Sequence, residues 1–257
     1  MASCEGHIEA LVNRVQEMML KFEGEDSEPC LFLSPSAYDT AWLAMVPDFG
    51  EERERRPMFA GCLDWILENQ RPEGFWGERD CHGYPTIDSV TSTLACIVAL
   101  KTWGLGHDHI QKGMAFINST SAKLLTSEGE DDHSKYPCWF VIVFPAMLEL
   151  ARDIGEQVTF PDDVKEVLAD VFRHRRHILE TKKQVEGNYD HHPPFLAYLE
   201  ALPPTYKIDN ETILSNLDHD GSLFQSPSAT AAAYLATGDH QALSYLRRLL
   251  PNCTSGG

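Results

Sequence analysis

The stretch SPSAYDTAW, residues 34–42, decides how the chain folds. Ser34 can cap a helix whose first position is Pro35, because proline lacks only an N–H group that would be unpaired there. Tyr38 and Trp42 then lie on one face of that helix, one turn apart. The stretch therefore predicts a capped helix with an aromatic stripe, and we interpret the stripe as core packing.

The composition excludes several classes of function. A chain of 257 residues can form one large or two small domains with a substantial core, and 43% hydrophobic residues indicate a globular protein. The formal net charge is −18, from 39 acidic against 21 basic residues, so we expect no nucleic-acid partner and no anionic membrane partner. An anionic substrate such as a diphosphate would need metal ions to bridge it to so acidic a protein.

The cysteines, the apolar segments and the first residues indicate in which cellular compartment the protein is expected. The seven cysteines are odd in number and form no Cys-x-x-Cys pair, which favours free thiols in a reducing compartment. The longest apolar runs, such as residues 139–144, are too short to span a bilayer. Residues 1–8 contain a glutamate and no lysine or arginine, so they resemble neither a signal peptide nor a transit peptide. If Met1 is the true start, we expect a cytoplasmic protein.

Helical periodicity recurs along the chain, with apolar residues three and four positions apart. No strand-like alternation persists, and we interpret the charge-dense segment 48–56 as a solvated loop. The pattern predicts an all-α fold of roughly ten to twelve helices. The predicted helices cover about residues 8–22, 35–46, 57–70, 86–103, 110–117, 138–154, 164–183, 194–201, 208–217, 227–237 and 240–250.

A weak internal repeat predicts how these helices are arranged. The turn EGFW at residues 73–76 precedes an apolar helix that contains STLA at residues 92–95. The turn DGSLF at residues 220–224 precedes one that contains ATAA at residues 229–232. In both, a turn with an acid, a glycine and an aromatic residue lies between an outer and an inner helix. We therefore expect helical hairpins in a closed double ring, in which each turn pins one hairpin against the next.

Four stretches, in this order, resemble landmarks of the plant labdane-type diterpene synthases, the copalyl diphosphate synthases and kaurene synthases. They cover nearly the whole chain from residue 31 onward, and they are SAYDTAWLAMVP at 36–47, QRPEGFWG at 70–77, STLACIVALKTWG at 92–104 and DGSLFQSPSATA at 220–231. Glu73 replaces the usual aspartate. The sequence of the last stretch is most similar to that of kaurene synthase-like members of the family.

The resemblance implies a domain organisation. The family has an α domain with class I ionisation chemistry, a β domain, and a γ domain inserted into β. By this resemblance, residues 1–28 are the leading helix of a β-type domain, residues 34–250 form a γ-type helical barrel, and residues 251–257 are a tail. The chain is then an N-terminal portion that lacks the rest of β and all of α.

Neither acidic motif of this family is complete in the chain. Class II cyclisation uses Asp-x-Asp-Asp, in which one carboxylic acid protonates the substrate, and class I ionisation uses Asp-Asp-x-x-Asp to hold magnesium ions on a diphosphate. The segment from Asp162 to Glu166 fits Asp-Asp-x-x-Glu, but it follows a proline at a helix start, where carboxylates complement the helix dipole. Residues 218–221, DHDG, match a turn, and residues 131–135, DDHSK, match a solvated loop.

Histidine pairs offer no stronger site. His107 with His109, and His191 with His192, could each begin a metal site, but neither has a second pair at ligand spacing. We interpret all four as surface histidines. The sequence therefore predicts no catalytic, cofactor-binding or metal-binding residues in this chain, although Mg²⁺ is expected for the full-length family.

Two hypotheses about function follow. In the first, the chain is part of a terpene synthase of diterpenoid biosynthesis, a family that acts on geranylgeranyl or copalyl diphosphate, and the chain alone is inactive. In the second, it is a non-catalytic helical module that binds a full-length synthase or a hydrophobic ligand. In either case, a prenyl diphosphate is a partner only if the missing domains are present. The resemblance implies a plastid location.

Overall fold

A computed structural model describes residues 36–49, 55–126, 136–183 and 195–254. These residues belong to the second of two units, residues 35–257. The helix predicted over residues 8–22, and with it the domain proposed for residues 1–28, lies outside the described residues.

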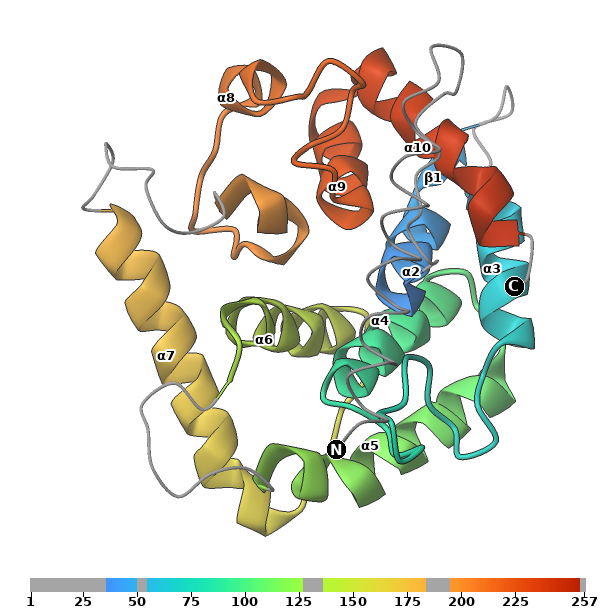
Figure 1. The fold of residues 1–257 in the computed structure, drawn as a ribbon, viewed down its shortest axis with the longest axis vertical. Coiled ribbons are helices and arrows are strands. Elements are labelled where there is room, and N and C mark those ends of the chain that lie inside the picture. Colours follow the sequence, from blue (N-terminus) through green and yellow to red (C-terminus); the bar gives the residue numbers. More distant parts are fainter. Residues whose placement is uncertain (1–35, 50–54, 127–135, 184–194, 255–257) are drawn as a thin grey trace, which may run out of the picture. The chain divides into compact units, whose positions relative to one another are not determined.

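Helices dominate the described part of the chain, so the predicted all-α class is confirmed. The helices are α2 (Ala37–Met45), α3 (Ala60–Glu68), α4 (Asp88–Thr102), α5 (His107–Thr126), α6 (Cys138–Asp153), η1 (Asp162–Val164), α7 (Lys165–Lys183), η2 (Phe195–Ala201), α8 (Asn210–Ser215), α9 (Pro227–Thr237) and α10 (His240–Thr254). Figure 1 shows their arrangement.

A short hairpin lies where the sequence predicts a loop without strands, so that part of the prediction is wrong, although Arg55 and Arg56 are exposed as expected of a solvated segment. Strands β1 (Pro47–Phe49) and β2 (Arg55–Pro57) pair antiparallel, with Pro47 opposite Pro57. The Arg56 guanidinium donates to Asp48 Oδ2 at 2.7 Å across the hairpin. Each strand has only three residues, too few for an alternating pattern to be recognised in the sequence.

The start of α2 differs from the predicted start by two residues. The cap is Ser36, whose hydroxyl accepts a hydrogen bond from the Asp39 N–H at 3.3 Å. The prediction of Ser34 as the cap, with Pro35 at the first helical position, is therefore wrong. Ser36 has the same capping chemistry as Ser34, and it places Asp39 in the first turn, where a carboxylate complements the helix dipole.

Two further helices differ from expectation. Residues 195–201 form a 3-10 helix with a non-helical Tyr198, not an α-helix. Helix α10 ends at Thr254, beyond the predicted end near residue 250, so part of the predicted tail is helical.

The helices form two concentric rings. In the inner ring, α2 packs against α4, α4 against α6, α6 against η2, η2 against α9, and α9 against α2 again, which closes the ring. Outside it, α3, α5, α7, α8 and α10 each pack on an inner helix, and α10 also contacts α3 (Figure 1). The predicted double ring is thus confirmed.

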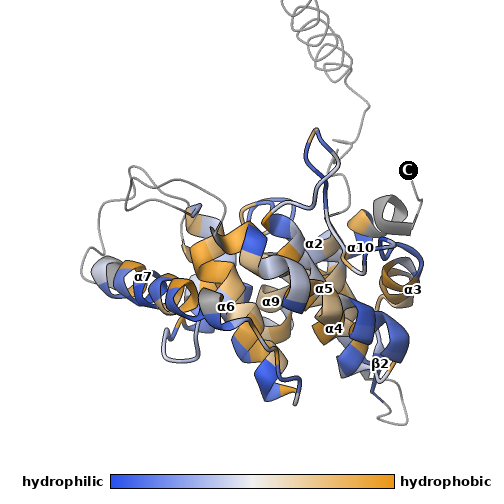
Figure 2. Cartoon of the chain, turned by 90° about the horizontal axis from the view of Figure 1, so that it is seen from below, coloured by the Kyte–Doolittle hydropathy of each residue, from blue (hydrophilic) through white to orange (hydrophobic). Residues whose placement is uncertain are grey.

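Helix α4 of the inner ring is buried on all sides, as expected for a helix enclosed by a second layer. Every residue of α4 from Ser89 to Leu100 is buried. In α6, Phe140 and Phe144 stack with their ring centroids 4.8 Å apart, and Phe144 meets Phe160 edge to face. Figure 2 shows α6 largely hydrophobic, whereas the outer helix α7 mixes hydrophilic and hydrophobic residues.

The two repeated turns fasten neighbouring hairpins together, as the repeat predicts. Gly74 has φ +98° and Gly221 has φ +85°, backbone conformations that favour glycine. A Cβ at Gly74 would overlap the carbonyl oxygen of Lys112 in α5, and one at Gly221 would overlap that of Gln241 in α10. Each glycine therefore allows its turn to lie against the outer helix of the next hairpin.

Candidate functional site

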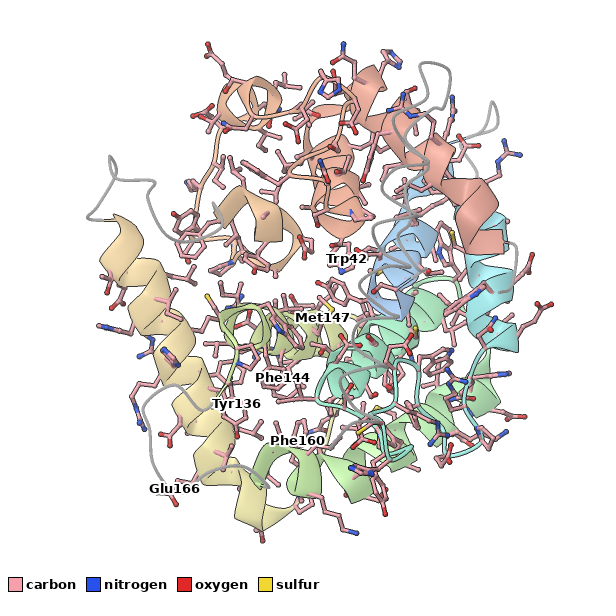
Figure 3. The ribbon with its side chains drawn as sticks, in the orientation of Figure 1. Trp42, Tyr136, Phe144, Met147, Phe160 and Glu166 are labelled. Carbon is pink, nitrogen blue, oxygen red and sulfur yellow. The ribbon has the colours of Figure 1, made fainter. Side chains whose placement is uncertain are left out.

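Asp162 and Glu166, the first and last acids of the candidate Asp-Asp-x-x-Glu segment, lie at the protein surface. The Asp162 side chain is 91% exposed and pairs with Lys165 Nζ at 2.6 Å. The hydrogen bond from Lys165 lowers the pKa of Asp162. Glu166 is also exposed and points outward from the start of α7 (Figure 3). The segment has the geometry of an exposed helix start, with a local ion pair.

Asp218 and Asp220 belong to the second repeated turn. The Gly221 N–H donates to the Asp218 carbonyl at 2.8 Å, which closes the turn. Asp220 Oδ1 accepts from the Ser222 N–H at 2.9 Å and from the Ser222 hydroxyl at 2.7 Å. The Asp218 backbone and the Asp220 carboxylate therefore hold the turn in shape, as the turn interpretation predicts.

The described histidines do not form a metal-binding cluster with acidic residues. His107 lies at the start of α5, where its Nε2 is 3.0 Å from Gln111 Nε2, and His109 accepts a hydrogen bond through its carbonyl from Gln70. Residues 131–135 and the pair His191–His192 lie outside the described residues. Within the described ranges, no group of three histidine, cysteine, aspartate or glutamate residues could hold a metal ion.

A surface cavity of about 280 Å³ lies beside α7. Its charged lining residues are two arginines and two glutamates, namely Glu149, Arg175, Arg176 and Glu180. Because these charges balance, the cavity offers no net positive charge to a diphosphate. Arg175 is itself committed to the protein, since it donates to Glu149 Oε2 at 2.8 Å and to the Ala201 carbonyl at 2.7 Å.

In the part of the chain that the structure describes, no helix is long and apolar enough to cross a membrane.

The sequence did not predict a cluster of polar side chains that joins three segments of the inner ring. From α2, the Tyr38 hydroxyl donates to Glu200 Oε1 in η2 at 3.1 Å. Also from α2, Asp39 Oδ1 accepts from the Ser228 N–H at the start of α9 at 3.2 Å. Trp42 lies next to this cluster, with its ring edge-on to Tyr38, and points toward Met147 of α6 (Figure 3).

Burial dominates the electrostatics of this cluster. The pKa of Glu200 is raised to about 8, chiefly by burial and in smaller part by the neighbouring Asp39, while hydrogen bonds, among them those from Tyr38 and Ser228, act in the opposite direction. Burial also raises the pKa of Asp39, against the hydrogen bonds from Ser228. Burial and the charge of Glu200 raise the pKa of Tyr38. The sequence contained one indication of this cluster, Asp39 within the SAYDTAW stretch, and no indication that Glu200 belongs to it.

Comparison with known proteins identifies the family. No family model matches the sequence. An S-linalool synthase from Clarkia breweri is 41% identical over 266 residues, covering 100% of this chain and 30% of the relative. An (E,E)-geranyllinalool synthase from Arabidopsis thaliana is 38% identical, covering 99% of this chain and 30% of the relative. The solved structure of ent-copalyl diphosphate synthase from Arabidopsis thaliana matches with a TM-score of 0.69 and 32% identity, over 86% of this chain and 30% of that one.

The chain belongs to the plant terpene synthase family. Ent-kaurene synthase-like and copalyl diphosphate synthases are also among its relatives, so the resemblance to this family is confirmed. Abietadiene synthase from Abies grandis, with a TM-score of 0.70 and 30% identity over 96% of this chain and 30% of that one, shows the same fold. The chain spans about 30% of the length of the relatives that it matches.

Proposed function

We propose that the chain forms the helical-barrel portion of a plant terpene synthase and supports chemistry that other portions of the synthase perform. The geometry of the acidic segments carries this proposal. Asp162 is exposed and paired with Lys165, and Asp220 is hydrogen-bonded within its own turn. Ionising a prenyl diphosphate instead requires several carboxylates that converge on magnesium ions. The chain alone is then inactive.

The substrate and location follow from the same proposal. The complete synthase acts on a prenyl diphosphate, geranylgeranyl or copalyl diphosphate, and uses Mg²⁺ held outside this chain. The partner of this barrel is the remainder of a synthase, on the same or another polypeptide. A plastid location is supported by relatives such as a chloroplastic ent-trachylobane synthase from Ricinus communis, which is 35% identical.

A product assay tests the proposal. The purified chain is incubated with Mg²⁺ and geranylgeranyl or copalyl diphosphate, and the extract is analysed by gas chromatography. We expect no terpene above a boiled control. A product that disappears in Asp162→Ala or Asp220→Ala would show that these carboxylates form a real catalytic site. A full-length relative assayed in parallel shows that the conditions support turnover.

A further inference from the structure

The carboxyl group of Glu200 lies in an environment that disfavours its charge. Its Oε1 accepts the hydrogen bond from Tyr38 at 3.1 Å. Its Oε2 is shielded from solvent and has no hydrogen-bond partner among the described residues. An ionised carboxylate would leave this oxygen without a donor and without water, which costs far more than burying a neutral acid.

No cation compensates that charge in the described part of the ring. Helix α2 presents Tyr38 and Asp39, and Asp39 raises the pKa of Glu200. Helix α9 presents the uncharged Ser228, and η2 itself presents Tyr198, next to which Cys138 of α6 lies.

The guanidinium of Arg175 is bound to other groups. Arg175 of α7 binds the carbonyl of Ala201, the residue after Glu200, and its ion pair is with Glu149. Its positive charge is thus used on a partner other than the Glu200 carboxyl.

We infer that Glu200 is a neutral carboxylic acid in the folded protein at neutral pH, and that the buried contact of its carboxyl group with Tyr38 and Asp39 is a pH-sensitive clamp between α2 and η2. The clamp joins segments 162 residues apart in the chain. Helix α2 and segment η2 are bridged in the ring by α9, so the clamp reinforces the place where the inner ring closes. Ionisation of Glu200 puts a second negative charge beside Asp39 and loosens this closure.

The direction of the pH effect follows from linkage. Because the pKa of Glu200 is raised to about 8 in the folded state, the folded chain holds a proton that the unfolded chain has already released. This extra stability is fully present below the ordinary glutamate pKa and is lost as pH rises toward 8. Asp39 and Asp88, whose pKa values are also raised by burial, act in the same direction.

Urea unfolding of the 257-residue chain between pH 5 and pH 9 tests the clamp. Glu200→Gln keeps an oxygen that accepts from Tyr38 but cannot ionise. We expect the unfolding equilibrium constant of wild type to rise with pH by up to about tenfold per unit relative to that of Glu200→Gln, until it levels off near pH 8. Glu211→Gln, at an exposed position in α8, serves as the matched control and should keep the wild-type pH dependence. An equal pH dependence in wild type and Glu200→Gln would overturn the inference.

Carbon-13 NMR of glutamate carboxyl groups gives a readout that needs no stable glutamine variant. One signal should titrate near pH 8 in wild type, far above the others. In Tyr38→Phe that midpoint should move higher still, because the lost hydroxyl had favoured the charged form. If every glutamate titrates at an ordinary acidic pH, Glu200 is ionised and the clamp does not exist.

Discussion

The two repeated turns use the same backbone arrangement and fill it with different side chains. In the first turn, the Trp76 N–H donates to Thr93 Oγ1 of α4 at 3.1 Å. In the second, the Leu223 N–H donates to Thr230 Oγ1 of α9 at 2.9 Å. The inner-helix threonine has the same role in both, so the structural repeat goes further than the similarity of the two sequences.

The turns differ in how their interiors are stabilised. Trp76 is fully buried, and its indole N–H donates to the Ile66 carbonyl at 2.7 Å. The second turn has no such anchor and instead places Phe224 and Gln225 at φ +52° and +55°, conformations unfavourable for residues other than glycine. In both turns, a glycine lies against the outer helix and a threonine of the inner helix accepts a backbone hydrogen bond. The other residues of the two turns differ.

The largest effect is expected when the fastening glycines gain a side chain. Gly74→Ala and Gly221→Ala should each destabilise the fold by about 3 kcal/mol, because a positive φ and an overlap with a backbone carbonyl act together. Gly104→Ala is the matched control, since Gly104 also has a positive φ, +64°, but open space around it. Urea unfolding should show a much smaller loss there. Equal losses at all three glycines would mean that contact with the outer helices is unimportant.

A smaller effect is expected from the two threonines. Thr93→Val and Thr230→Val each remove an acceptor and leave a buried backbone N–H unpaired, at a cost of about 1 to 3 kcal/mol. Thr230→Val should cost more, because the Thr230 hydroxyl donates to the Ser226 carbonyl at 2.6 Å, whereas the Thr93 hydroxyl donates to the Trp76 carbonyl at a longer distance of 3.4 Å. Thermal melts of both variants provide the measurement. If neither variant melts below wild type, the structural equivalence of the two turns has no energetic meaning.

The sequence predicted most of this fold because its signals are local. Helical periodicity and the recurrence of glycine before an apolar helix suffice to predict the helices and their double ring. The hairpin at Pro47–Phe49 and Arg55–Pro57 escaped prediction because three-residue strands carry no pattern. The contact between Tyr38 and Glu200 could not be predicted, since it depends on how the ring closes between segments far apart in the chain.

The smallest effect is expected from relief of strain in the second turn. Gln225 is exposed, and the hydrogen bond that it receives from Tyr245 uses its backbone carbonyl. Gln225→Gly should therefore stabilise the fold by up to about 1 kcal/mol. This gain is the backbone strain that glycine relieves, minus the stability lost because glycine makes the unfolded chain more flexible. The melting temperature should rise by up to about 3 °C for a protein of this size. Glu180→Gly, at an exposed helical position, should lower it, and a fall in both variants would show that Gln225 is not strained.

We propose that Asp162 and Asp220 have structural roles and do not bind Mg²⁺. The most direct test is calorimetric titration of geranylgeranyl diphosphate into the chain, with Mg²⁺ present and with Mg²⁺ chelated. The predicted result is the same heat with and without chelator after subtraction of the heats of dilution, because Asp162 and Asp220 are engaged in an ion pair and a turn. Saturable binding that requires Mg²⁺ and is lost in Asp162→Ala or Asp220→Ala would contradict it.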